Sequence, residues 1–342
     1  MSTLDPRQKL ERSKWLVPGY SLSNILKSEE YISNNIATLL NWMDRYAAQK
    51  KPLDLCEYLT YTTLDNAGEA IFSQPFGFIN EGRDIGNLIK NNLTLNPLVA
   101  AAGFFIWVYV ILVANPIITW TGLLPMGHLF DTAAAAMKKR KENPDARFDI
   151  AAHWFKTQRA NPDKLSNRDI EAAATMGVGA GGDTTSCGIQ TFVYHMIRNP
   201  QCWARARAEI DNAVREGRCR DRVTSYADAQ ELSFLQAGIK ESLQIERVLG
   251  PDAHEFDPDR WAADDIAIKE KYRLVFGAGY NACPGQHLAK VQLPKMAATF
   301  VRDYNIELVD KDKEWKWKAY FTVVPHSWPV FISKAAGGGD TL

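Results

Sequence analysis

The sequence predicts a mainly α-helical fold with a small amount of β-structure. Long segments in the middle of the chain have charged residues on one side of a helical projection and apolar residues on the other. The segment from Lys316 to Ser333 is instead rich in aromatic and β-branched residues around two prolines, which is typical of a β-hairpin. The chain has 342 residues, 46% of them hydrophobic and 23% charged, which is enough for a substantial core.

Four segments are predicted to be helical. The first begins at Ser166, which forms a capping-box pattern with Asp169, and continues as one long helix to Asn199. Its interior contains four glycines, each of which costs about 1 kcal/mol relative to alanine, so the cluster requires an explanation. These glycines are Gly177, Gly179, Gly181 and Gly182. The other three predicted helices span residues 201–214, 233–244 and 286–304.

The longest apolar segment is Leu98–Ala114, and no charged residue occurs between residues 93 and 126. Its length is close to that needed to cross a bilayer. However, Trp107 and Tyr109 lie inside it, whereas the aromatic residues of a membrane span are enriched at its two ends. A single span, a buried core helix and an apolar element that enters one leaflet are all consistent with this pattern.

Composition excludes several classes of protein. The 40 basic and 40 acidic residues balance, so no overall field attracts nucleic acid. The five cysteines are odd in number and irregularly spaced, with no CxxC pair, which predicts reduced thiols facing the cytosol rather than a disulfide framework or a zinc site. The first residues are polar and lack the apolar core of a secretory signal.

The stretch from Phe276 to Gly285, FGAGYNACPG, has the features that a haem-thiolate loop requires. Phe276 provides an apolar wall beside the sulfur of Cys283, while Gly279 and Gly285 allow tight turns and Pro284 stiffens the loop. A helix that begins near Gly285 directs its positive end toward the thiolate. Thiolate ligation favours cleavage of the O–O bond, the step that forms a hydroxylating oxidant. The alternative interpretation is a buried structural cysteine in a glycine-rich turn.

This loop resembles the FxxGxxxCxG signature of the cytochrome P450 superfamily, and the resemblance extends over nearly the whole chain. It implies the cytochrome P450 fold in a single domain over residues 1–334, followed by a flexible tail over 335–342. It also implies haem (iron protoporphyrin IX) as the cofactor, with Cys283 as the axial ligand of the iron and with Phe276, Gly279 and Gly285 beside it. Short strings near the C-terminus resemble fungal members of the group that contains pisatin demethylase.

The segment Ala180–Thr185 resembles the distal helix of this family, in which a local widening makes room for dioxygen. The resemblance assigns to Thr184 a hydrogen bond to the iron-bound oxygen and to Asp183 the relay of protons. The alternative is an Asp-Thr pair that caps a break in a helix.

Two further segments resemble family elements but depart from them. Residues 240–244 resemble the ExxR helix, with Gln244 in place of the arginine, and Arg260 resembles the residue of the following meander with which Glu241 pairs. An ordinary exposed glutamate is the alternative for Glu241.

Residues 5–21 resemble an early family helix in which an arginine binds a haem propionate. Ser13 occupies that position, so Arg12 is expected to serve, with Lys14 as a second choice; a solvated basic helix face is an equal alternative.

Two family segments have no counterpart: an N-terminal anchor with the first sheet, and the region between the ExxR helix and the meander, which the sequence passes over between residues 244 and 248. Asn281 also stands where the family has a cation that binds a propionate. We therefore expect weak retention of haem, because charge-assisted contacts of about 1.5–3 kcal/mol each are lost. A truncated, catalytically impaired haem-binding remnant is the alternative to an active enzyme.

The resemblance implies a monooxygenase that inserts one oxygen atom of O2 into a small apolar substrate, in fungal secondary metabolism. NADPH-cytochrome P450 reductase is the expected electron donor, and no nucleic acid is expected as a partner. The expected location is the endoplasmic reticulum membrane, facing the cytosol, with membrane contact or a single span through Leu98–Ala114.

Overall fold

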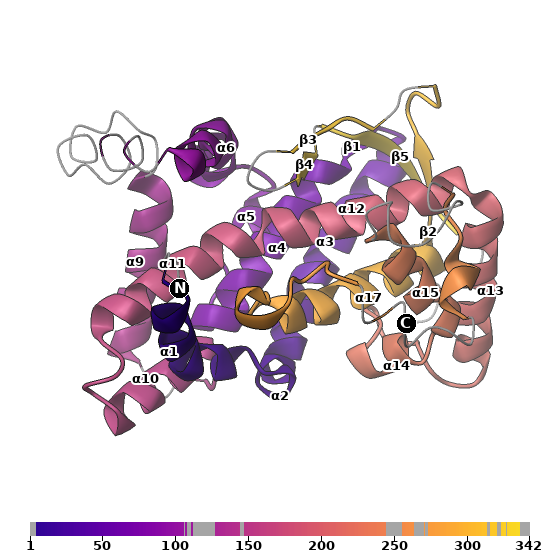
Figure 1. Cartoon of the computed structure of the whole chain (residues 1–342). Coiled ribbons are helices and arrows are strands. Elements are labelled where there is room, and N and C mark those ends of the chain that lie inside the picture. Colours follow the sequence, from indigo (N-terminus) through magenta and orange to yellow (C-terminus); the bar gives the residue numbers. More distant parts are fainter. Residues whose placement is uncertain are drawn as a thin grey trace. The chain divides into compact units, whose positions relative to one another are not determined.

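The fold is mainly helical with short strands (Figure 1). The structure is a computed structural model, and it describes residues 5–105, 107, 111, 127–143, 147–243, 255–262, 270, 273–312, 315–319, 323–325 and 327–335. Contacts divide the chain into two compact units. Unit 1 comprises Met1–Tyr31, Thr60–Thr184 and Lys316–His326, and unit 2 comprises Ile32–Leu59, Thr185–Trp315 and Ser327–Leu342. The single domain over residues 1–334 stays a prediction.

Helices of unit 1 bury apolar faces against one another. They are α1 (Pro6–Leu16), α2 (Leu22–Ile25), α5 (Phe78–Glu81), α6 (Leu88–Phe104), α9 (Gly127–Glu142), α10 (Ile150–Ala160), α11 (Asn167–Gly181) and most of α4 (Leu55–Phe72). Trp154 of α10 is fully buried, and its Nε1 donates a hydrogen bond to the Leu16 carbonyl at 2.9 Å. Asp149 caps the start of α10 and forms a buried ion pair with Arg140 of α9 at 2.7 Å. These contacts tie the end of α1 to α10, and α9 to the residue that precedes α10.

Unit 2 combines helices with a small antiparallel sheet. Its helices are most of α3 (Glu29–Gln49) and of α12 (Asp183–Arg198), followed by α13 (Pro200–Arg215), α14 (Tyr226–Gln230), α15 (Ser233–Ser242) and α17 (Gln286–Asp303). The sheet has the order β1 (Leu53–Asp54), β5 (Pro329–Lys334), β2 (Tyr304–Leu308), with Val330 opposite both Leu53 and Leu308. Because α17 is buried along almost its whole length, it forms the centre of this unit.

The predicted helices over 201–214 and 286–304 correspond to α13 and α17, and the one over 233–244 corresponds to α15 as far as Ser242. The prediction of one continuous helix from Ser166 to Asn199 is wrong, because the structure contains α11 and α12 with a break at Gly182. The glycine cluster is the physical reason, since residues without side chains weaken a helix where they gather. The capping box of Ser166 with Asp169 is present as predicted.

The predicted hairpin over residues 316–333 is partly correct. Strands β3 (Trp317–Ala319) and β4 (Val323–Pro325) form an antiparallel pair in unit 1. Strand β5, however, pairs with β2 and β1 in unit 2 instead of extending that hairpin. The proline at 325 is the last residue of β4, as expected for a residue that cannot donate a hydrogen bond to a neighbouring strand.

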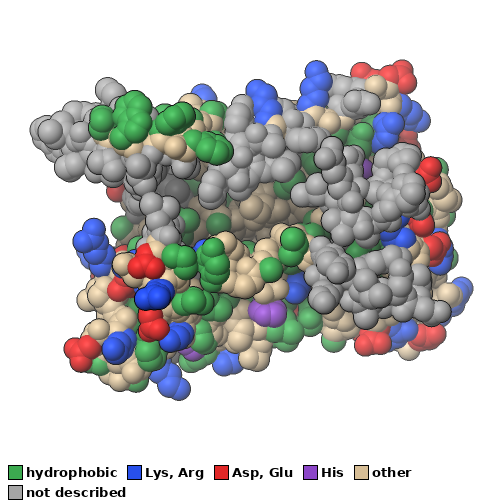
Figure 2. Space-filling view, viewed as in Figure 1, with side chains coloured by type: hydrophobic (Ala, Val, Ile, Leu, Met, Phe, Trp, Pro, Cys, Tyr) green, Lys and Arg blue, Asp and Glu red, His purple; other side chains and the backbone are tan. Residues whose placement is uncertain are grey.

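The apolar segment Leu98–Ala114 is described only in part, through the end of α6 and at Trp107 and Ile111. The side chains of Phe104 and Trp107 are 86% and 63% exposed, and Phe105 and Ile111 are also exposed, so a buried core helix is wrong for these positions. Figure 2 shows hydrophobic side chains on the surface where α6 lies. Within the described residues, no helix combines the length and hydropathy that a membrane span requires.

Candidate functional site

The loop before α17 brings Phe276, Gly279, Cys283 and Gly285 together. The backbone N–H of Cys283 donates to the Phe276 carbonyl at 2.7 Å, which closes the loop. Gly279 has a φ of +59°, in the left-handed region that favours glycine. Gly277, which the sequence analysis did not single out, is more constrained: its φ is +66°, and a Cβ there would lie 2.8 Å from the Asn281 carbonyl oxygen.

Backbone donors from the start of α17 point at the sulfur of Cys283. The backbone N–H groups of Gly285 and Gln286 lie close enough to this sulfur to lower the pKa of the thiol, and the Gln286 N–H also donates to the Cys283 carbonyl at 3.4 Å. Partial desolvation raises the pKa of the thiol, and these two N–H groups act in the opposite direction. Because α17 has 18 residues, its N-terminal partial charge also favours an anionic sulfur. The arrangement can stabilise a thiolate once a metal replaces the proton.

The surface next to Cys283 fits a flat apolar cofactor. Cys283 is itself exposed, and Leu274 and Tyr280, nine and three residues before it in the chain, are 64% and 50% exposed. Large apolar side chains are seldom left in water around a reactive sulfur without a partner to cover them. Haem iron needs one axial ligand from the protein, and the exposed Cys283 sulfur can provide it in a segment that also has exposed apolar side chains. The residues present therefore fit haem.

The break between α11 and α12 is held open by threonine hydroxyls. Thr63 of α4 donates to the Gly182 carbonyl at 2.9 Å, and Thr184 donates to the Ala180 carbonyl at 2.8 Å. A Cβ on Gly182 would lie 2.6 Å from Leu64 of α4, so only glycine allows this approach of the two helices. Thr184 is exposed, so its hydroxyl is accessible from outside the helix.

Asp183 follows the break directly, and among the described residues the side chain of Asn92 of α6 contacts its carboxylate. The Nδ2 of Asn92 donates to Oδ2 of Asp183 at 2.7 Å. Burial raises the pKa of Asp183 to about 6, and the hydrogen bond from Asn92 opposes part of that rise. A carboxyl group with such a pKa exchanges protons readily near neutral pH.

Glu241 of α15 accepts hydrogen bonds on both carboxylate oxygens. Arg260 donates from Nε to Oε1 at 3.0 Å, and the Asp257 N–H donates to the same oxygen at 3.1 Å. Trp261 donates from Nε1 to Oε2 at 2.7 Å. Glu241 and Arg260 are both buried, so Glu241 is not the exposed glutamate that was the alternative. Trp261 was not among the predicted site residues, although its place directly after Arg260 was the available signal.

Arg12 lies on α1 and pairs with Asp169 at the start of α11, with 3.7 Å between Nε and Oδ1. Its side chain is 44% exposed, and the neighbouring Lys14 pairs with Glu11. Arg12, Asp183 and Thr184 belong to unit 1, whereas the Cys283 loop and the Glu241 network belong to unit 2. Gln244 lies outside the described residues.

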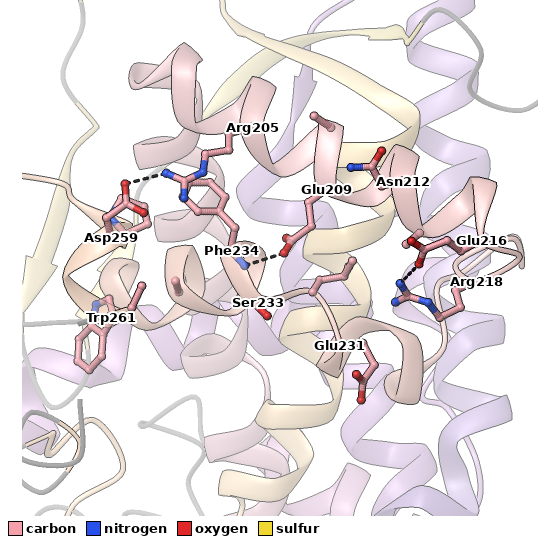
Figure 3. A pocket seen from close by; sticks show the side chains of 16 residues that line it. Arg205, Glu209, Asn212, Glu216, Arg218, Glu231, Ser233, Phe234, Asp259 and Trp261 are labelled. Carbon is pink, nitrogen blue, oxygen red and sulfur yellow. Dashed lines mark hydrogen bonds and ion pairs between the residues drawn. The ribbon is translucent and has the colours of Figure 1, made fainter. Parts of the chain in front are cut away.

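A surface pocket of about 640 Å³ in unit 2 lies between α13, the start of α15 and the segment around Trp261 (Figure 3). Most of the charged groups that line it have partners among the described residues. Arg205 pairs with Asp259 at 2.7 Å, and Glu209 accepts hydrogen bonds from the backbone N–H groups of Phe234 and Leu235. Figure 3 shows Arg205 directed at Asp259, and Glu209 directed at the backbone of Phe234. No reactive group of the Cys283 loop lines it, so we do not assign it to the reaction.

Comparison with known proteins gives a consistent result. A family model described as "Cytochrome P450" matches residues 3–250 and 249–327. The cytochrome P450 monooxygenase gsfF of Penicillium aethiopicum is 26% identical over 370 residues, covering 93% of this chain and 73% of the relative. The cytochrome P450 monooxygenase ACRTS1 of Alternaria alternata is 25% identical over 356 residues, covering 87% of this chain and 92% of the relative. The crystal structure of the cytochrome P450DA haem domain superposes with a TM-score of 0.77 at 16% identity, covering 95% of this chain and 77% of the other.

Proposed function

The chain belongs to the cytochrome P450 family, whose members are haem-binding monooxygenases, and from this we propose that Cys283 is the axial thiolate ligand of its haem iron. The observation that carries the proposal is the pair of N–H groups, from Gly285 and Gln286, that point at the sulfur. Among the described residues, a Cβ at Gly285 would meet only that sulfur, at an ordinary contact distance of 3.9 Å, so crowding within this part of the chain does not require glycine there. Phe276 and Gly279 then lie beside the haem.

Bound haem supplies the activation of O2, and the chain supplies protons and shape. We place the proton relay at the Asp183 carboxylate, whose pKa of about 6 allows it to release and recover a proton near pH 7. Thr184 is an exposed residue at the break in the helix, and its hydroxyl donates a hydrogen bond to the Ala180 carbonyl there. Glu241 and Arg260 have a structural role, because they form a buried ion pair that stabilises the fold.

The substrate class and the electron donor follow from the family. The proposed reaction inserts one oxygen atom of O2 into a small apolar molecule, with electrons from NADPH-cytochrome P450 reductase. The fungal origin of gsfF and ACRTS1 supports a place in fungal secondary metabolism. The proposal that the chain lies near pisatin demethylase rests on the short strings near the C-terminus alone. Arg12 is proposed to reach a haem propionate in place of its present partner Asp169.

The exposed end of α6 supports contact with a membrane. Phe104, Phe105 and Trp107 present apolar surface that water solvates poorly, and no charged residue occurs from residue 93 to residue 126. We propose that this part of Leu98–Ala114 enters the cytosolic leaflet of the endoplasmic reticulum.

An impaired haem-binding remnant is the second candidate, because the alignment with gsfF runs over 370 residues, more than the 342 of the whole chain. The relative therefore has residues to which nothing here corresponds. The two ranges matched by the family model also meet at residues 249–250, next to the expected gap after Gln244. These observations favour the loss of a segment between α15 and the Glu255–Trp261 region.

Carbon monoxide difference spectroscopy tests the assignment of Cys283. The dithionite-reduced protein is expected to give the red-shifted Soret band of thiolate-ligated haem, and C283A is expected to lose it. C202A is the matched control, because Cys202 is a partly buried cysteine of α13 outside the loop. A band typical of histidine ligation, or an unchanged band in C283A, would exclude the assignment. Haem that is lost on dialysis while the red-shifted band is present beforehand would favour the impaired remnant.

A further inference from the structure

The Asp183 carboxylate is held by a residue of another helix. Asn92 of α6 donates to it at 2.7 Å, whereas the neighbouring Thr184 directs its hydroxyl to the Ala180 carbonyl. An amide donor both orients a carboxylate and stabilises its charged form. Asn92 lies 91 positions before Asp183, so neither residue's local sequence provides this contact.

The start of α6 is fixed, which fixes Asn92. The carboxylate of Asp84 accepts hydrogen bonds from the backbone N–H groups of Ile89 and Lys90 at 3.1 and 3.0 Å. Leu88 and Leu95 of the same helix are buried. The first turns of α6 therefore form a rigid support, and the Asn92 side chain starts from a defined position.

From this geometry we propose that Asn92 is the positioning residue for Asp183: it holds the carboxylate at the break between α11 and α12 and keeps it available as a proton donor. The inference rests on the proposed function for the role of the proton, but the contact itself does not. The two can fail separately.

Other ionisable groups on the helices at the break do not replace Asn92. The charged residues and histidines among them are Glu57, Asp65 and Glu69 on α4, Lys90 on α6, Arg168, Asp169 and Glu171 on α11, and His195 and Arg198 on α12. Asp65 accepts hydrogen bonds from backbone N–H groups of residues 76–79, and Glu69 and Glu171 pair with Arg147 and Lys141. Burial and Asn92 are the influences that set the pKa of Asp183.

Asn96 provides a matched control on the same helix. It follows Asn92 by four residues and so lies on the same face of α6. It is buried, and its Nδ2 has no hydrogen-bond partner. Replacement of Asn96 by leucine removes the same amide from the same face without breaking a hydrogen bond.

Infrared difference spectroscopy of the haem-loaded protein, without turnover, tests the proposal. The carbonyl band of the protonated acid, taken as the difference from D183N, reports the titration of Asp183. We expect a midpoint near pH 6 in the unaltered protein, a midpoint higher by about one pH unit in N92L, which is a tenfold change in the dissociation constant, and no change in N96L. N92A serves the same purpose if N92L does not fold.

Equal midpoints in N92L, N92A and the unaltered protein would overturn the proposal. A shift of the same size in N96L would also overturn it, because the change in the Asp183 midpoint would then come from the polarity of this face of α6 and not from the Asn92 hydrogen bond. Carbon monoxide difference spectra of the same samples report on haem ligation independently. Loss of the thiolate band in all samples would count against the proposed function while leaving the titration result valid.

Discussion

Replacement of Trp261 by phenylalanine tests the network around Glu241. The change keeps most of the ring, which is 3% exposed, but removes the Nε1–H that donates to Oε2 of Glu241 at 2.7 Å. The hydrogen bonds from Arg260 and Asp257 both go to Oε1, so Oε2 loses the donor that the structure shows for it. A hydrogen bond to a charged group contributes about 1.5–3 kcal/mol, and we expect W261F to lower the free energy of unfolding by about 2 kcal/mol.

Urea unfolding followed by circular dichroism in the far ultraviolet measures this effect, since it does not depend on indole fluorescence. W203F is the control, because Trp203 of α13 is only partly buried and its recorded ring contact is with Arg207, at 6.0 Å. We expect W203F to change the free energy of unfolding by less than about 0.5 kcal/mol. If both variants lose the same stability, the indole of Trp261 contributes only by packing, and the network does not depend on its N–H.

Two further predictions concern the break in the distal helix. G182A places a Cβ 2.6 Å from Leu64, and we expect it to lower the free energy of unfolding by about 1–3 kcal/mol in thermal unfolding. L64A should restore part of this loss in the double variant. G238A is the control, because its Cβ would meet Met196 at an ordinary 3.5 Å, and it should be neutral or stabilising. D183N should change the pH dependence of stability, because the pKa of Asp183 is raised from 3.8 to about 6 on folding. The contribution of Asp183 to the free energy of unfolding is fully present below pH 3.8 and is lost as the pH rises through 6. The stability of the unaltered protein relative to D183N should therefore fall by at most about 3 kcal/mol between pH 4 and pH 7, and a flat difference would contradict the raised pKa of this carboxyl.

The Cys283 loop was predictable from sequence because its geometry is imposed over a few residues. The close contact that requires glycine at 277 is with the carbonyl of Asn281, and the donors to the sulfur come from Gly285 and Gln286. All of these lie within one short stretch, so the spacing of residue types contains the structural constraint. The same holds for the capping box of Ser166, whose partner is three residues away.

The break between α11 and α12 was only partly predictable. The glycine cluster indicated a local disturbance, but a continuous helix was still expected, since the helical pattern resumes beyond it. The contacts that fix the break come from Thr63 and Leu64 of α4, more than a hundred residues away in sequence. Asn92 was missed for the same reason, because one asparagine in a polar stretch carries no signal until the fold places it beside Asp183.

This difference between local and distant constraints has a functional consequence. The thiolate loop depends on its own residues, so substitutions at Asn92 or Thr63 should leave the ligation of the haem iron by Cys283 unchanged. The position of the Asp183 carboxylate instead depends on α6, which ends in the exposed apolar residues Phe104 and Phe105. A displacement of α6 would therefore act on proton delivery before it acted on the cofactor. We therefore expect haem binding by the Cys283 loop and the proposed proton transfer at Asp183 to be separable, so that a variant can impair one while the other remains.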